Sequence, residues 1–179
     1  MTHPRLLPAV AAVALVAGCG EGPHAPPLVR EPTYRNARTG LTLTPPAGWL
    51  MQSRAEPPPG PLPRPKVLVS YMSPKGDRAM LEVEVANPVP DADLEKFLAD
   101  NPIGGQKWGV KEKRTATTAG GQPAVRLAFS HPGQKGEIVR EVTVVQRADL
   151  TVFFVATCYG SDQAARDAVR RAVDTVIWE

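Results

Sequence analysis

The chain has 179 residues, a formal net charge of +3 and two cysteines. This length suits one domain of roughly 150 residues preceded by a short additional segment. The small net charge gives no reason to expect the concentrated basic face that binds phosphate backbones, so we expect no nucleic-acid partner.

An apolar segment near the N-terminus predicts export. Arg5 gives a short basic start, residues 6–17 are almost wholly apolar, and the run closes on small residues, which together are typical of a signal peptide. A membrane-spanning helix needs about 20 apolar residues, so this run is too short to span a bilayer. We interpret residues 1–18 as a signal peptide that is removed.

The segment ends in the order Val16-Ala17-Gly18-Cys19. This ending resembles the lipobox of bacterial lipoproteins, which implies cleavage before Cys19 and acylation of its sulfur and its new amino group. Several acyl chains, palmitate among them, would make membrane attachment effectively permanent. The expected location is the cell membrane or the outer membrane, lipid-anchored and facing the periplasm or the exterior. An ordinary secretory signal that ends in cysteine is the alternative.

The lipidated cysteine is followed by an expected tether. Residues 20–31 are rich in proline and lack an apolar period, so we interpret residues 19–31 as the lipidated cysteine and a disordered tether, and residues 32–179 as the folded domain. If Cys19 carries lipid, Cys158 has no partner for an internal disulfide. Cys158 lies in an apolar run, and we expect it to be buried and unreactive.

The domain opens with a predicted hairpin. Short strands at Tyr34–Ala37 and Leu41–Thr44 are joined by a turn that contains glycine. The corner Pro45–Trp49 then ends the ladder, and its glycine lets Trp49 fold back against the core.

A proline-rich loop follows at residues 56–65, because so many prolines cannot supply a regular set of backbone hydrogen bonds. It is predicted either to be a stiff surface insertion between strands or to present Pro58, Pro61 and Pro63 as a polyproline recognition arm.

Beyond this loop the apolar residues alternate, which predicts strands. In Arg78–Ala86, Glu82 and Glu84 share one face and could offer oxygens to a divalent cation. Two carboxylates are too few for a metal site, so we interpret them as a solvent-facing row, and we expect no bound metal. The predicted strands are Lys66–Ser73, Arg78–Ala86, Val110–Thr118, Pro123–Ser130, Glu137–Gln146 and Thr151–Tyr159.

Two helices are predicted. The first runs from Asp91, as N-cap, to about Asp100, with Leu94, Phe97 and Leu98 on one stripe. The second runs from Asp162 to about Trp178 behind a Ser161 cap, with an apolar stripe that extends to Ile177. Because the strand at Thr151–Tyr159 is apolar on both faces, we expect helices to cover both sides of the sheet.

The sequence offers little catalytic chemistry. Ser130 and His131 are neighbours, but neighbours on a strand point to opposite faces, and no Gly-x-Ser-x-Gly motif is present. We interpret His131 as a turn residue. No glycine-rich phosphate loop or metal-spaced cluster of cysteine and histidine occurs either, so we expect neither a cofactor nor an enzyme.

The segments 40–49 and 151–178 carry a family resemblance. A hairpin that ends in a Pro-x-Gly-Trp-like corner, a helix, a meander of strands and an apolar strand that runs into a C-terminal helix resemble the PsbP-like superfamily. The resemblance implies an α+β fold, a three-layer α/β/α sandwich around a mainly antiparallel sheet. It also implies a protein that acts by binding.

Our hypothesis from the sequence is a membrane-anchored, non-catalytic envelope lipoprotein that binds a protein partner or assists assembly. The alternative is a small-ligand binder that uses an apolar cleft between helices and sheet; an enzyme ranks third. The expected interaction residues are Trp49, Trp108, Pro58, Pro61 and Pro63.

Overall fold

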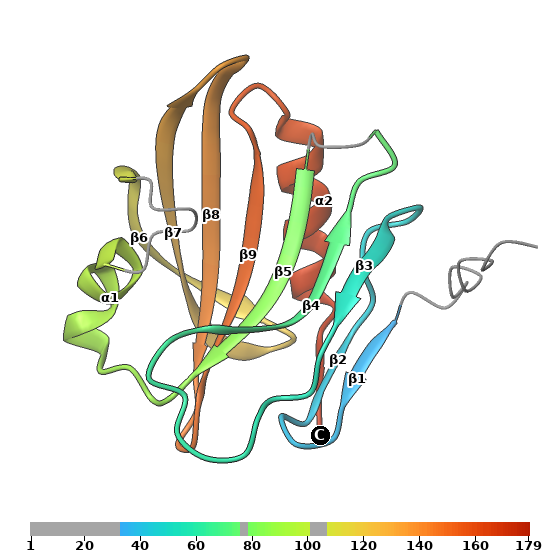
Figure 1. Cartoon of the computed structure of the whole chain (residues 1–179), viewed down its shortest axis with the longest axis vertical. Helices are drawn as coiled ribbons and strands as arrows, with labels where there is room; N and C mark the ends of the chain where they lie inside the picture. Colours follow the sequence, from blue (N-terminus) through green and yellow to red (C-terminus); the bar gives the residue numbers. More distant parts are fainter. Residues whose placement is uncertain (1–32, 76–78, 101–106) are drawn as a thin grey trace, which may run out of the picture.

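A seven-stranded antiparallel sheet forms the centre of the protein in the computed structural model, which describes residues 33–75, 79–100 and 107–179 (Figure 1). The predicted signal peptide, Cys19 and the tether lie outside the described residues. The strand order is β3-β4-β5-β9-β8-β7-β6, and each pair is antiparallel. The strands are β3 (Leu50–Arg54), β4 (Lys66–Met72), β5 (Ala79–Ala86), β6 (Gly109–Ala119), β7 (Gln122–Gly133), β8 (Gly136–Gln146) and β9 (Thr151–Tyr159).

The two faces of β9 belong to different cores, because successive side chains of a strand point to opposite faces. Phe154 lies in a core with α2 (Gln163–Asp174), whereas Phe153 lies in a second core with α1 (Leu94–Asp100). The ring of Phe97, from α1, stacks on Phe153 with 5.8 Å between centroids. The three-layer α+β sandwich is therefore confirmed, with one helix over each face of the sheet (Figure 1).

A second, three-stranded sheet contains the predicted hairpin. Its order is β1 (Tyr34–Asn36), β2 (Leu41–Leu43) and β10 (Ile177–Trp178). The last helix therefore ends earlier than predicted, at Asp174, and its cap is Asp162, whose carboxylate accepts from the Ala165 N–H at 3.1 Å.

The prediction that the apolar helix stripe reaches Ile177 is wrong, since this side chain is 59 % exposed in β10. Residues 177–178 form a strand instead of continuing the helix, because they pair with β2. Trp178 secures the new direction, donating its indole N–H to the Ala119 carbonyl at 2.8 Å.

Strand β3 was not predicted, because its side chains are mostly exposed and show no apolar alternation. Directly before it, the Trp49 N–H donates to the Pro46 carbonyl at 3.1 Å in the predicted corner. The Trp49 side chain is buried in the core on the α2 side, as expected for a ring that folds back.

The first helix begins with a short 3-10 turn, η1 (Asp91–Asp93), so the expected Asp91 cap is wrong: Pro90 occupies the N-cap position. The Asp91 carboxylate is held instead by Arg114, at 2.6 Å. The predicted apolar stripe is confirmed, with Leu94 and Leu98 buried and Phe97 packed against the same core.

A buried cluster of charges fixes α2 to the sheet. Glu141 on β8 is 4 % exposed, and it accepts two hydrogen bonds from Arg170, at 2.7 and 2.5 Å, and one from Arg166, at 3.2 Å. The Arg126 side chain lies 3.5 Å from the same carboxylate. We call these four residues the Glu141 cluster. Burial alone would raise the pKa of Glu141, but the arginine hydrogen bonds and charges outweigh burial and lower it.

Candidate functional site

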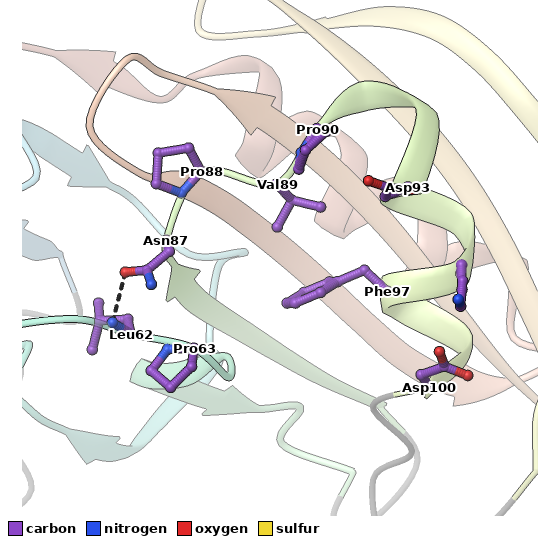
Figure 2. A pocket seen from close by; sticks show the side chains of 10 residues that line it. Leu62, Pro63, Asn87, Pro88, Val89, Pro90, Asp93, Phe97 and Asp100 are labelled. Atoms are coloured by element: carbon purple, nitrogen blue, oxygen red, sulfur yellow. Dashed lines mark hydrogen bonds between the residues drawn. The ribbon is translucent and has the colours of Figure 1, made fainter.

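A groove lies between the proline-rich loop and α1, with a volume of about 480 Å³ (Figure 2). One wall comes from the loop, a second from the segment after β5, and the third from η1 and α1. The lining residues are Leu62, Pro63, Asn87, Pro88, Val89, Pro90, Asp93, Lys96, Phe97 and Asp100.

Hydrogen bonds hold the first two walls in place. The Leu62 N–H donates to the Asn87 side-chain oxygen at 2.6 Å, and the Asn87 N–H donates back to the Leu62 carbonyl at 2.9 Å. The Val89 N–H donates to the Thr151 hydroxyl, and the Val89 carbonyl accepts from Gln146. Because prolines also restrict the backbone here, the groove is formed before any partner binds.

The lining combines an apolar floor with charges on the helix side. Leu62 and Val89 are buried, and the Phe97 ring extends from α1 toward the loop (Figure 2). Asp93, Lys96 and Asp100 are exposed on the third wall. None of the described lining residues is a serine, cysteine or histidine, and the lysine and aspartates among them are exposed to solvent.

The structure brings only one of the expected interaction residues into this groove. Pro63 lines it, whereas Pro58 and Pro61 are exposed elsewhere on the loop. The Pro58 carbonyl accepts from Arg38 at 2.7 Å. Leu62, within the loop, is buried, so the loop is partly packed against the domain. The interpretation of the loop as a stiff insertion that lies only on the surface is therefore wrong.

The two tryptophans among the expected interaction residues, Trp49 and Trp108, do not line the groove. Trp49 is only 7 % exposed and belongs to the core. Trp108 is half-buried against the core on the α1 side, where its ring and the His131 ring form a T-shaped pair with 4.5 Å between centroids.

Sequence reasoning missed most of the groove. Its second wall, Asn87-Pro88-Val89-Pro90, has two prolines directly after a strand, and this pattern was the available signal. The pairing of Leu62 with Asn87 joins segments 25 residues apart and has no sequence motif.

The interpretation of Glu82 and Glu84 as a solvent-facing row is wrong. Glu84 is 5 % exposed, and its nearest charged partner is Arg140, itself buried, at 3.7 Å. Burial raises the pKa of Glu84 to about 7, and the Arg140 charge offsets only part of that rise. Burial also raises the pKa of Glu82. We call Glu82, Glu84 and Arg140 the Glu84 cluster.

The Glu84 cluster does not amount to a metal centre. In the part of the chain that the structure describes, no three side chains of histidine, cysteine, aspartate or glutamate come together as metal ligands.

Ser130 and His131 do not form a catalytic pair. His131 belongs to strand β7, so its interpretation as a turn residue is wrong. Its ring contacts Trp108 on the α1 side of the sheet, whereas Ser130 hydrogen-bonds Glu137. Adjacent strand residues point to opposite faces, which keeps the hydroxyl and the imidazole apart.

Cys158 is buried, as expected. Burial raises the pKa of its thiol to about 11, far above the range in which a thiolate nucleophile operates near neutral pH.

Among the described residues, neither helix has the length and apolar character needed to cross a bilayer.

No protein-family model matches the chain, and no curated protein is significantly similar to it in sequence. Solved structures do match its fold. The cyanobacterial PsbP (CyanoP) from Synechocystis sp. PCC 6803 superimposes with a TM-score of 0.52 at 12 % identity, covering 82 % of this chain and 91 % of that one.

LpqN of Mycobacterium tuberculosis, described as involved in cell envelope biogenesis, also matches with a TM-score of 0.52 at 12 % identity. The match covers 81 % of this chain and 89 % of LpqN. At such low identity these likenesses establish the fold alone. The domain has a PsbP-like fold, in agreement with the sequence resemblance.

Proposed function

We propose that this protein is a lipid-anchored, non-catalytic envelope protein whose PsbP-like domain binds another protein through the groove beside the proline-rich loop. The observation that carries the proposal is the groove itself. It is open, formed in advance by hydrogen bonds and prolines, and apolar at its floor, and its described residues include no serine, cysteine or histidine and no metal cluster. Such a surface suits recognition, because a rigid site loses little entropy on binding.

The envelope location is supported by two independent features. The sequence Val16-Ala17-Gly18-Cys19 resembles a lipobox, and one protein of the same fold, LpqN, is described as involved in cell envelope biogenesis. An anchored domain of this kind would search for partners along the membrane surface.

The anchor is tested with Cys19→Ser. The variant is expected to lose labelling by a fatty-acid probe and to leave the membrane fraction, because the acylated sulfur is gone. Cys158→Ser is the matched control and should retain the label. Unchanged labelling of Cys19→Ser would contradict the anchor.

The binding surface is tested by photo-crosslinking in intact cells of the source organism. A crosslinking amino acid at Pro63, on the groove, is expected to give a discrete adduct. The same group at Arg171, exposed on α2 on the other face of the sheet, should not. Equal adducts at both positions, or none at Pro63, would contradict a partner at the groove.

A small apolar ligand is the alternative occupant, since a volume of about 480 Å³ lies within the range of ligand sites. Small-ligand sites usually aim several buried polar groups at the ligand. The described buried polar atoms without a partner belong to Tyr34, Glu82, Trp108, Arg140 and Arg166, and none of these residues lines the groove. The geometry therefore favours a protein partner.

A further inference from the structure

The groove's first two walls expose almost no backbone hydrogen-bond donor. Positions 63, 88 and 90 are prolines, which have no N–H. The N–H groups of Leu62, Asn87 and Val89 are already donated to protein acceptors. Among the described lining residues, these two walls can therefore donate to a partner mainly through the exposed Asn87 side-chain amide rather than through the backbone.

The third wall adds negative charge. Asp93 and Asp100 lie on the groove, and Lys96 is the one cation among its described lining residues. No ion pair of either aspartate occurs among the described residues, whereas nearby Asp91 is bound by Arg114. Two carboxylates against one ammonium leave this rim acidic, and exposed charges of this kind select a partner of opposite sign.

Taken with the proposed protein-binding function, on which this step rests, we infer that the groove takes an extended, positively charged segment of a partner protein. An aliphatic side chain of that segment enters beside Leu62, Val89 and Phe97. A flanking arginine or lysine donates to Asp93 or Asp100. The cationic side chain matches the acidic third wall in charge, and its N–H groups can donate to the two carboxylates.

The inference is tested with the full chain in lipid nanodiscs and three fluorescent hexapeptides of sequence Gly-X-Leu-Val-X-Gly, in which X is arginine, glutamine or glutamate. Fluorescence anisotropy is expected to show that the arginine peptide binds at least about tenfold more tightly than the glutamate peptide, with the glutamine peptide between them. The difference should shrink as salt is raised, because exposed charges are screened.

A matched pair of variants places this preference on the groove. Asp93→Asn combined with Asp100→Asn is expected to weaken the arginine peptide roughly three- to tenfold and to leave the glutamine peptide unchanged. Glu95→Gln removes an exposed acid of the same helix that does not line the groove, and it should leave all three peptides unchanged.

Equal binding of the three peptides, no measurable binding of the arginine peptide, or an unchanged preference in the double variant would overturn the inference. A crosslinked adduct at Pro63 would then still support the proposed function. Absence of that adduct would contradict the proposed function itself. Failure of the peptide preference and failure of the proposed function are therefore distinguishable.

Discussion

The Glu141 cluster and the Glu84 cluster lie on opposite faces of the same sheet, and the pKa of the central carboxyl is shifted in opposite directions in the two clusters. Arg140 and Glu141 are consecutive on β8, so their side chains point to opposite faces. On the α2 face, Glu141 is paired with three arginines, and its pKa is lowered. On the α1 face, Glu84 and Glu82 share one arginine among the described residues, Arg140, and the pKa of Glu84 is raised.

The difference lies in hydrogen bonding rather than in burial, because Glu141 and Glu84 are 4 % and 5 % exposed. Glu141 accepts hydrogen bonds from the guanidinium groups of Arg166 and Arg170, whereas Arg140 stands 3.7 Å from Glu84 and its Nε is a buried atom without a partner. Charge pairs stabilise a buried site only when their geometry is good. The Glu141 cluster therefore holds α2 in place, and the Glu84 cluster is a weak point.

The largest expected effect is at Glu141. Glu141→Gln should lower the free energy of unfolding by about 3 kcal/mol at pH 7, because it leaves arginines buried without their shared counter-charge. Chemical denaturation measures this directly. A loss below about 1 kcal/mol would mean that the α2 face does not depend on the cluster.

An intermediate effect is expected from Arg140→Met, which removes the only cation paired with Glu84 among the described residues. The variant should lose about 2 kcal/mol at pH 8 and less at pH 6, since protonation can neutralise the two remaining acids. Denaturation at both pH values tests this. A loss that is the same at pH 6 and pH 8 would contradict the assignment of this pH dependence to protonation of Glu82 and Glu84.

The smallest effect is expected from Glu84→Gln, below about 1 kcal/mol at pH 7, because burial already disfavours the charged carboxylate there. The informative measurement is the pH profile. A carboxyl whose folded pKa is raised binds protons better in the folded state, so its contribution to stability falls as pH rises from about 4.3 to about 7.

Glu84→Gln should remove most of the fall in the free energy of unfolding that accompanies the rise in pH toward about 7. It should leave the loss of stability at acid pH, where the lowered pKa of Glu141 makes its contribution disappear as pH drops below its ordinary value. An unchanged slope between pH 5 and pH 7 would contradict the assignment to Glu84.

The same two faces show how far sequence reasoning reaches. The alternation of Ala79, Leu81, Val83 and Val85 correctly predicted a strand and its apolar face. It could not reveal that on the other face Glu84 is buried and Glu82 is half-buried, because their burial depends on how the other elements pack on that face. Alternation of polar and apolar residues identifies a strand and leaves open what lies on its polar side.

The candidate site was harder to predict than the fold. Strands and helices follow local patterns, and Pro63 was singled out within its loop. The groove, however, arises where a loop, the end of β5 and a short helix meet, and hydrogen bonds such as Leu62 with Asn87 decide its shape. The C-terminal strand β10 was missed for the same reason: only contact with β2 turns Ile177 away from a helix.

Strand β2 lies between β1 and β10, which bears on how the domain folds. The small sheet joins the start of the domain to its last residues, down to the hydrogen bond from the Glu179 N–H to the Gly40 carbonyl. A chain made from its N-terminus would therefore leave one edge of β2 unpaired until residues 177–178 are available. Folding of the small sheet therefore depends on residues at the two ends of the domain, which must come together before β2 has both of its partners.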